Sequence, residues 1–418
     1  MVSRAAARLA ADTPAIATAH FRAEADPYHP TTNPDGYINL GTAESRLMWD
    51  LLAPRLIAPR NLSASDVHYG QLHGMAELRA AIAALLGQTW RTPVDEEHLV
   101  VVSGATAALD IAATVLCDPG EAIVVPAPYY SALDVDLVGR SGARLVPVPM
   151  TAAGGFALDP AELHRALSGL RRDSVPVRAV AVTSPANPQG HVHSVATLRD
   201  LLRVVAAHGV DVIADEIYAH SVFGPGRFVS VRDPEVLAGV PEIDPDRVHV
   251  VWGFAKDFAL SGLKVGVLHT SGAENHAAAR ALAYFAPTST DTQALLRDLL
   301  VDTDWLRHFL AEGKARLAAS YRHATDLLSR HGIGYIPAAA AFSIWVDLRE
   351  HLSEACFAAE HALWQRIFGT AKLNILPGKF FSSPEPGWFR LCHAVDPAVV
   401  RDGIARLGAV VARSRRTA

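Results

Sequence analysis

Two side chains that could do chemistry come directly after runs of apolar residues. Lys256 follows such a run in VHVVWGFAKD, and Asp215 ends the run VDVIAD. An amine at the carboxyl end of a buried parallel strand lies where open α/β sheets bind ligands, and burial would lower its pKa and leave it nucleophilic. A carboxylate there needs a cationic partner to offset its desolvation. The alternatives are a lysine in a surface loop and an aspartate that caps a helix.

Polar turns supply further candidates. Tyr218 lies three residues after Asp215, and Asn187 lies in AVTSPANPQG, where prolines on either side hold its amide rigidly. The run VVVSGATAALD is typical of a strand, a turn at Gly104 to Thr106 and a helix, which together present free amides and a hydroxyl to an anion. The alternative for the Asn187 segment is an ordinary turn. The alternative for VVVSGATAALD is any strand–helix junction that has a threonine near the helix cap.

The elements that must position these residues alternate between strands and helices. Between residues 98 and 270, apolar β-branched runs are separated by longer helical patterns, one of them YYSALDVDLVGR at 129–140. Strands that are apolar throughout are typical of a sheet covered on both faces, and their alternation with helices favours right-handed βαβ units. We therefore expect an α/β domain with a mostly parallel sheet and helices on both faces. The expected strands are 99–103, 122–125, 144–148, 178–183, 210–215, 248–252 and 264–269.

A second, smaller α+β domain is predicted after residue 272, where the pattern changes to long helical stretches. We assign residues 51–303 to the large domain and residues 304–418 to the small one. Residues 1–50 lack a strong period, and we expect them to form an arm that packs on the small domain or on a partner subunit. The expected elements of the small domain are a helix at 304–330, a strand at 341–346, and helices around 358–368 and from Pro397.

The composition limits the kinds of partner. The chain has 418 residues, of which 50% are apolar and 19% charged, with a net charge of −5, so it can bury a large core and offers no basic surface to nucleic acid or an anionic membrane. Its N-terminal residues lack the continuous apolar run of a secretory signal, and its three scattered cysteines argue against a disulfide scaffold. We expect a cytoplasmic protein without membrane or nucleic-acid partners. His191 and His193 have the spacing of metal ligands, but no third ligand is near, so no metal is expected.

Taken together, these segments resemble those of a known superfamily. SGAT, PAPYY, SPANPQG, DEIY, AKD and WFRLCHA occur in the order found in fold-type-I enzymes that depend on pyridoxal 5′-phosphate, among the class I and II aminotransferases. INLGTAES, LNILPG and PGWFRLCHA are similar to the 1-aminocyclopropane-1-carboxylate synthase branch. The resemblance runs from about residue 38 to the C-terminus, and it implies the type I aminotransferase fold.

For the cofactor ring, the resemblance implies a role for each candidate. Lys256 would bind the cofactor covalently and later move the proton at the substrate Cα. Asp215 would pair with the pyridinium nitrogen and keep it protonated. Tyr218 and Asn187 would hydrogen-bond the phenolate oxygen, and Tyr130, in PAPYY, would stack on the ring. Lys256, Asp215 and Tyr218 are the expected catalytic residues.

For the cofactor phosphate, the resemblance implies binding by Ala105 and Thr106 at a helix N-terminus. The family's serine-x-serine before the lysine is replaced here by Gly253-Phe254-Ala255, and Lys264 replaces the arginine that comes eight residues after the lysine. One bidentate cation has become a point charge, and two hydroxyls are missing. We therefore expect weaker retention of the cofactor or a replacement donor from elsewhere.

For the substrate, the resemblance implies that Arg390, in WFRLCHA, binds the α-carboxylate through its forked guanidinium. From its own sequence context, Arg390 could also be an arginine in a surface ion pair. Ala43 and Glu44, in GTAES, would lie near the substrate. The synthases place a tyrosine two residues before the glycine of His-Gly, where this chain has Leu72. Tyr69 fits the wider aminotransferase spacing and could reach the phosphate of a neighbouring subunit.

These features predict a homodimeric enzyme with shared active sites that acts on an L-α-amino acid. We expect elimination or substitution chemistry on S-adenosylmethionine or a related sulfur-containing amino acid. The alternatives are an aminotransferase and a β-eliminating carbon–sulfur lyase, because all three begin with loss of the Cα proton. A ligand-binding regulatory module is disfavoured by the lack of a basic helix-turn-helix before residue 38. An NAD-dependent enzyme is disfavoured by the lack of a glycine fingerprint.

Overall fold

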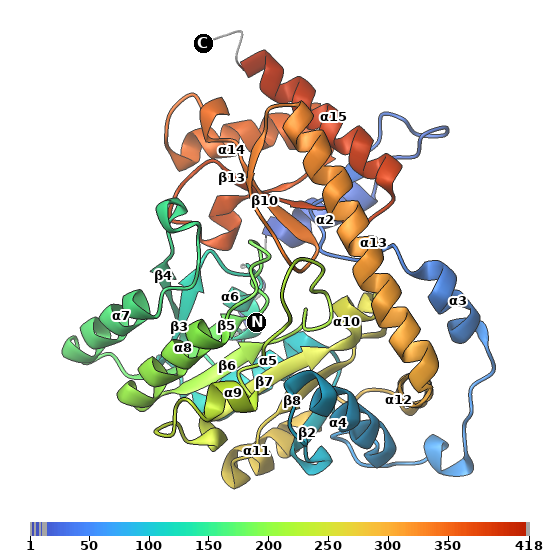
Figure 1. Ribbon diagram of the computed structural model, residues 1–418, viewed down its shortest axis with the longest axis vertical. Coiled ribbons are helices and arrows are strands. Elements are labelled where there is room, and N and C mark those ends of the chain that lie inside the picture. The colour runs from blue at the N-terminus through green and yellow to red at the C-terminus, as the bar shows by residue number, and fades with distance from the viewer. Residues whose placement is uncertain (1, 4–5, 8–9, 11–14, 415–418) are drawn as a thin grey trace.

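A seven-stranded sheet forms the centre of the large domain (Figure 1). The computed structural model describes residues 2–3, 6–7, 10 and 15–414, so part of the predicted arm at 1–50 lies outside the described residues. In spatial order the strands are β2 (Leu99–Val102), β8 (Gly266–His269), β7 (Val248–Gly253), β6 (Asp211–Asp215), β5 (Val177–Thr183), β3 (Ala122–Ala127) and β4 (Arg144–Pro149). Within the described residues, β8 is antiparallel to both neighbours and the other pairs are parallel, which confirms the mostly parallel sheet.

Helices cover both faces of this sheet because the strands are apolar on both sides. On β6, Val212 and Ala214 belong to one core cluster and Ile213 to the other. The first cluster is completed by α4 (Ala76–Trp90), α7 (Pro160–Arg172), α8 (Val195–His208), α9 (Pro234–Leu237) and α12 (Thr290–Val301), and the second by α5 (Ala105–Leu116), α6 (Leu133–Asp136) and α11 (Ala273–Ala283). Among the described residues, no helix combines the length and apolar character needed to cross a bilayer.

The small domain is built on a four-stranded antiparallel sheet. Its strands, in spatial order, are β12 (Leu376–Pro377), β13 (Trp388–Cys392), β10 (Ser343–Asp347) and β9 (Gly334–Ile336). Helices α14 (Phe357–Gln365), which continues as a π turn over Arg366–Thr370, and α15 (Pro397–Ser414) pack with it. The N-terminal segment adds α2 (Ala15–Glu24) and β1 (Ile38–Asn39), which pairs with β11 (Leu373–Asn374), whereas α3 (Trp49–Ile57) lies against the large-domain core.

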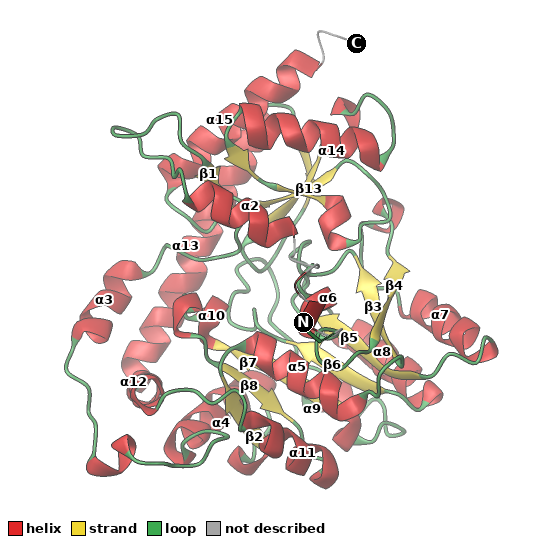
Figure 2. Ribbon diagram, turned by 180° about the vertical axis from the view of Figure 1, so that it is seen from behind, coloured by secondary structure: helices red, strands yellow, loops and turns green. Residues whose placement is uncertain are grey.

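One long helix runs along both domains (Figures 1 and 2). This helix, α13 (Thr303–Arg330), is capped by Asp302, whose side chain accepts a hydrogen bond from the Trp305 amide. Phe309, near its start, belongs to the large-domain core, whereas Leu328, near its end, belongs to the small-domain core. The helix therefore packs into the cores of both domains and connects them. The domain boundaries at residues 51–303 and 304–418 remain predictions.

The sequence wrongly predicts a full helix over residues 129–140. The structure forms only the four-residue α6 there, followed by turns as far as Ser141. Valine, serine and glycine in this stretch are weak helix formers, and the Tyr129 hydroxyl donates to the Asp134 carboxylate at 2.8 Å, which holds the entry to α6 as a turn.

A buried histidine on the inner side of the small domain lacks hydrogen-bond partners. His393 has no exposed surface, and within the described residues neither of its ring nitrogens has a partner. Its ring packs edge-on against Phe223 and Tyr321, with centroid distances of 5.8 and 5.7 Å. Burial lowers the pKa of His393 to about 3, so the folded protein holds the imidazole neutral at a cost in stability.

We predict that His393→Phe stabilises the protein, because phenylalanine fills a similar space without buried polar atoms. The gain should be about 1–2 kcal/mol at pH 8. In the unfolded chain the imidazole binds a proton below about pH 6.5, whereas in the folded chain it does not until about pH 3, so wild-type stability falls as pH falls through this window. The advantage of the variant should therefore grow between pH 7 and 5, as measured by urea unfolding. Replacing the exposed His308 by phenylalanine is the control, and an equal or lower stability of His393→Phe would contradict the prediction.

Candidate active site

Lys256 lies at the carboxyl end of β7, in the short helix α10 (Phe254–Asp257). Its Nζ donates a 2.6 Å hydrogen bond to the carbonyl oxygen of Ala43. Burial, reinforced by the nearby Arg390 guanidinium, lowers the pKa of Lys256 to about 8, although Cys392, Glu44 and Asp215 oppose the shift. The amine is thus neutral in an appreciable fraction of molecules near neutral pH, as a nucleophile or proton acceptor must be.

Asp215 ends the adjacent strand β6, and Tyr218 follows on the turn beyond it. Both side chains are buried. The Asp215 Oδ1 accepts a 3.3 Å hydrogen bond from the Ile217 amide. Burial raises the pKa of Asp215 to about 6, even though this amide and the Lys256 ammonium lower it. Such a carboxyl is suited to a protonated ring nitrogen as its partner.

A buried carboxylate holds these two turns together. Asp257, next to Lys256, accepts hydrogen bonds from the Ser221 hydroxyl at 2.7 Å, the His220 amide at 3.0 Å and the Trp252 indole at 3.1 Å. The first two donors lie on the turn after Tyr218. Asp257 therefore fixes the Lys256 turn relative to the turn that carries Tyr218.

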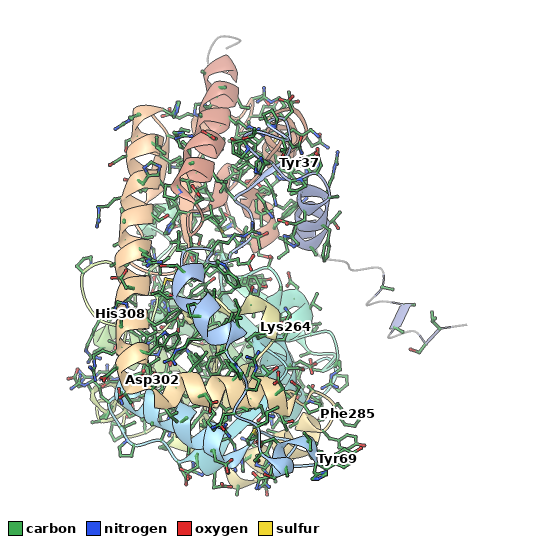
Figure 3. All side chains as sticks on the ribbon, turned by 90° about the vertical axis from the view of Figure 1, so that its right-hand side faces the viewer. Tyr37, Tyr69, Lys264, Phe285, Asp302 and His308 are labelled. Carbon is green, nitrogen blue, oxygen red and sulfur yellow. The ribbon has the colours of Figure 1, made fainter. Side chains whose placement is uncertain are left out.

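The N-terminus of α5 approaches the same region closely. Gly104 has φ +100°, which favours glycine, and a Cβ on Gly266 would lie 2.3 Å from the Gly104 carbonyl carbon. These glycines let β8 pass directly against the first turn of α5. Lys264, just before β8, lies beside Gly104 at the level where the two domains meet (Figure 3). A cation thus stands next to the free amides of a helix start, as an anion site requires.

Arg390 and Asn187 form the side of the site that belongs to β13 and the proline-rich turn. The buried Arg390 donates from Nη1 to Asn187 Oδ1 at 3.2 Å and from Nη2 to the Gly41 carbonyl at 2.7 Å. Its Nε has no hydrogen-bond partner among the described residues, and its guanidinium lies 4.7 Å from the Phe381 ring centroid. The surface ion pair considered from the sequence is therefore excluded, because this guanidinium is buried against neutral groups.

A cavity of ≈ 350 Å³ brings most of the predicted residues together. The predicted residues that line it are Ala43, Ala105, Thr106, Tyr130, Asn187, Asp215, Tyr218, Lys256 and Lys264. Two others contact its lining: Arg390 bonds to Asn187, and Glu44 accepts a 2.7 Å hydrogen bond from Ser261. Tyr69 is fully exposed on the outer surface (Figure 3), so within one chain it does not reach this cavity. Within the described residues, His191 and His193 are not part of any cluster of three metal-ligand side chains.

Of the lining residues that were not singled out from the sequence, two make side-chain hydrogen bonds at the site. Asp136, on α6, accepts a 3.3 Å hydrogen bond from the Thr106 hydroxyl, and Ser261 begins the 3-10 turn η5 (Ser261–Leu263) after Lys256. Burial raises the pKa of Asp136 to about 7, with Asp215 and Asp110 adding to the shift and Thr106 and Lys264 opposing it. Neither Asp136 nor Ser261 lies in a motif that the sequence analysis identified as a candidate catalytic or binding segment. Only the position of Ser261 between the two lysines could have drawn attention to it.

Comparison with known proteins accounts for this arrangement. The sequence matches the family "Aminotransferase class I and II" over residues 36–407. The 1-aminocyclopropane-1-carboxylate synthase 6 of Arabidopsis thaliana is 36% identical over 383 residues, which cover 89% of this chain and 77% of that protein. The 1-aminocyclopropane-1-carboxylate synthase of Nicotiana tabacum is 34% identical over 400 residues, covering 92% of this chain and 81% of that protein. The chain belongs to the class I and II aminotransferase family.

Solved structures show the same fold. Aspartate aminotransferase from Thermus thermophilus with maleate matches with a TM-score of 0.80 at 22% identity, covering 98% of this chain and 99% of that chain. The aromatic aminotransferase from Pyrococcus horikoshii OT3 matches with a TM-score of 0.76 at 22% identity, covering 91% and 97%. The predicted type I fold is confirmed, with its large α/β domain and smaller α+β domain.

Enzymes of this aminotransferase family use pyridoxal 5′-phosphate, so the predicted cofactor and the prediction of an enzyme are confirmed at the level of the family. The cavity suits this cofactor. It offers a buried amine and a buried carboxylate, Lys256 and Asp215, and a helix N-terminus with an adjacent cation, Lys264. These groups match an aldehyde, a ring nitrogen and a phosphate.

One of the two missing serines, at position 253, would not fit the packing of this chain. A Cβ on Gly253 would lie 2.8 Å from the Val265 carbonyl oxygen and 3.2 Å from Gly266 Cα. A serine there would force β7 and β8 apart. A stronger donor to the phosphate is therefore easier to introduce by substituting Lys264 than by restoring the serine.

We predict that Lys264→Arg tightens the binding of pyridoxal 5′-phosphate about fivefold, because a guanidinium can donate two parallel hydrogen bonds to a phosphate. Lys264→Gln should weaken binding about tenfold or more by removing the charge. Cofactor-free protein titrated with the cofactor and followed by absorbance gives both dissociation constants. Lys372→Arg is the matched control, since Lys372 has a similar left-handed backbone, with φ +51° against +53°. Unchanged affinity in both Lys264 variants would contradict a contact with the phosphate.

A second prediction concerns the pH dependence of cofactor binding. Above about pH 7 an ionised Asp136 would repel the phosphate and hold the proton of the Thr106 hydroxyl, so affinity for the cofactor should fall as pH rises. In Asp136→Asn this loss should be absent, and the ratio of wild-type to variant dissociation constants should rise about tenfold between pH 6 and 8.5. The titrations of Lys256 and of the free cofactor change both dissociation constants equally, so they cancel in the ratio.

Asp134→Asn is the control for Asp136, because Asp134 lies on the same helix α6 but accepts a 2.8 Å hydrogen bond from the Tyr129 hydroxyl and is not part of the cavity lining. A ratio that stays constant with pH would show that Asp136 does not sense the phosphate.

Proposed function

We propose that this chain eliminates or substitutes the γ-substituent of S-adenosylmethionine, or of a related sulfur-containing amino acid. The observation that carries the proposal is the convergence of Lys256, Asp215 and the Arg390–Asn187 pair at one cavity. Pyridoxal 5′-phosphate, when bound, withdraws electrons from the substrate Cα so that its proton can leave.

Lys256 would hold the cofactor and then exchange the proton at the substrate Cα. Its lowered pKa of about 8 suits both tasks, because a proton acceptor works best when its pKa lies near the working pH. Asp215 would hold a proton on the ring nitrogen, and Tyr218 and Asn187 would bond the ring oxygen. Tyr130, which also lines the cavity, would stack on the ring.

Arg390 would bind the α-carboxylate of the substrate. It is buried, it has an unpartnered Nε within the described residues, and its two Nη atoms now donate to neutral oxygens that a carboxylate could replace. A charged acceptor makes a stronger bond to a guanidinium than a carbonyl does. This would orient the Cα–H bond toward Lys256.

The choice of substrate rests on the relatives and on Glu44. The relatives named above are 1-aminocyclopropane-1-carboxylate synthases, and their similarity extends over about nine-tenths of this chain. Glu44 places a carboxylate beside the cavity, held by Ser261. A carboxylate there favours a substrate with a positive charge beyond its Cγ, as the sulfonium of S-adenosylmethionine has.

An aminotransferase is the second candidate, and Leu72 favours it. The synthases have a tyrosine at that position, whereas Tyr69 fits the wider aminotransferase spacing. If transamination is the activity, the same residues would return the proton to the cofactor rather than lose a substituent from the substrate.

We also propose a homodimer whose subunits share their active sites. Tyr69 is fully exposed, and Tyr284 and Phe285 are 64% and 68% exposed. Tyr69 and Phe285 both lie on the outer surface of the large domain (Figure 3). Large apolar side chains left outside a monomer are typical of subunit interfaces, and Tyr69 could then approach the phosphate end of the partner's cavity.

We predict that the purified protein with pyridoxal 5′-phosphate absorbs as a protein-bound cofactor and consumes S-adenosylmethionine with release of its thioether nucleoside, seen by mass spectrometry. Lys256→Ala should slow this turnover by about 10³-fold or more, because it removes the proton acceptor. A keto acid formed in proportion to a second amino acid, with no thioether release, would instead support the aminotransferase. A protein that shows no absorption of bound cofactor when the cofactor is in excess would overturn both candidate functions.

A further inference from the structure

The loop at residues 41–46 is anchored to the small domain at both of its ends. Before it, the Leu40 carbonyl accepts a 2.7 Å hydrogen bond from the Cys392 amide. At its end, the Arg46 amide donates to the Ala394 carbonyl at 2.8 Å. Cys392 is the last residue of strand β13, which also carries Arg390, and Ala394 lies two residues beyond it. The 41–46 loop is therefore part of the small-domain side of the cavity.

The middle of the 41–46 loop contacts the large domain and the site. The Ala43 carbonyl accepts from Lys256 Nζ at 2.6 Å, and the Gly41 carbonyl accepts from Arg390 Nη2 at 2.7 Å. The third hydrogen bond joins side chains, from the Ser261 hydroxyl to Glu44 Oε1 at 2.7 Å. Of the three donors, Lys256 and Ser261 belong to the large domain.

Two of these donors are needed elsewhere when the enzyme works. Under the proposed function, Lys256 is joined to the cofactor through its nitrogen and Arg390 holds the substrate carboxylate, so neither can be relied on to hold the loop. The Ser261 hydroxyl has no part in either task. Among the hydrogen bonds of the described residues, its bond to Glu44 is therefore the one between this loop and the large domain that catalysis would leave in place.

We propose that Ser261 is a positioning residue that, through Glu44, holds the 41–46 loop over the cavity and aims the Glu44 carboxylate at the substrate side chain. The proposal rests on the function proposed above. Ser261 follows Lys256 by five residues and begins the turn that leads to Lys264, so the bond fixes Glu44 relative to both lysines.

The competing role for Ser261 is as a replacement donor to the cofactor phosphate. A hydroxyl has one proton to donate, and Ser261 gives it to Glu44. Within the described residues, the other contact of the Glu44 carboxylate is an ion pair with Arg46 at 3.7 Å, in which the arginine side chain is 57% exposed, and such an exposed pair is too weak to orient the carboxylate. The geometry therefore assigns Ser261 to the substrate end of the cavity.

The decisive experiment compares Ser261→Ala with Ser261→Thr, which keeps the hydroxyl, in the cofactor-loaded enzyme. Hydrogen exchange of the amides of residues 41–46 should be about tenfold faster in Ser261→Ala and near wild type in Ser261→Thr. Ser271→Ala is the matched control, because Ser271 donates a bond of the same 2.7 Å length to Asp246 on the outer surface. Exchange unchanged in Ser261→Ala would overturn the proposal, whatever reaction the enzyme catalyses.

Kinetics supply the second measurement. With S-adenosylmethionine as substrate, Ser261→Ala should raise KM about tenfold and change kcat less than threefold, with an unchanged cofactor absorption band. Glu44→Gln still accepts the serine proton, so it should keep slow exchange in the loop but raise KM by removing the charge. Loss of cofactor from Ser261→Ala with unchanged KM would assign Ser261 to the phosphate and overturn the proposal. If S-adenosylmethionine is not turned over at all, the function fails, and the exchange measurement still decides the role of Ser261.

Discussion

The relative placement of the amine and the acid depends on one buried carboxylate that touches neither cofactor nor substrate. Asp257 accepts three hydrogen bonds, from an indole on β7 and from two groups on the turn that follows β6. Burial raises its pKa to about 7, and its three donors oppose that rise. Parallel strands β6 and β7 bring Lys256 and Asp215 to one edge of the sheet, and the Asp257 hydrogen bonds join the turn after β6 to the turn that carries Lys256.

Two buried cations set the second constraint. Lys256 and Arg390 lie close enough for the guanidinium to lower the pKa of the lysine. Within the described residues, their hydrogen-bond acceptors are neutral oxygens of Ala43, Gly41 and Asn187. Neutral oxygens satisfy the donors without cancelling the charges, so the cavity stays attractive to the anionic groups of an amino acid and a phosphate. A carboxylate in their place would stabilise the empty protein and compete with the substrate.

The sequence predicts the sheet well because each strand is apolar on both faces, a pattern that is typical of a parallel sheet covered by helices. It fails at residues 129–140, where a side-chain bond between Tyr129 and Asp134 replaces helical turns. It places Lys256, Asp215 and Thr106 correctly because strand ends and helix starts are local features. It misses Asp136 and Ser261, whose importance comes from partners 30 and 217 residues away. It also leaves Arg390 open between a surface ion pair and a buried site, because burial of a strand residue depends on how the domains meet.

The departures from the family pattern are not spread evenly over the site. Gly253, Ala255 and Lys264 lie at the end where α5 begins, whereas Arg390 and Glu44 remain at the end closed by the 41–46 loop. The close packing of β8 on β7 and α5 leaves no room for a Cβ at Gly253 or Gly266, so a serine at position 253 does not fit this packing. The resemblance assigns the phosphate to the α5 end, where these departures lie, whereas it assigns the substrate to Arg390 and Glu44, which match the family pattern. We infer that this chain diverged from its relatives in cofactor retention more than in the chemistry done on the amino acid.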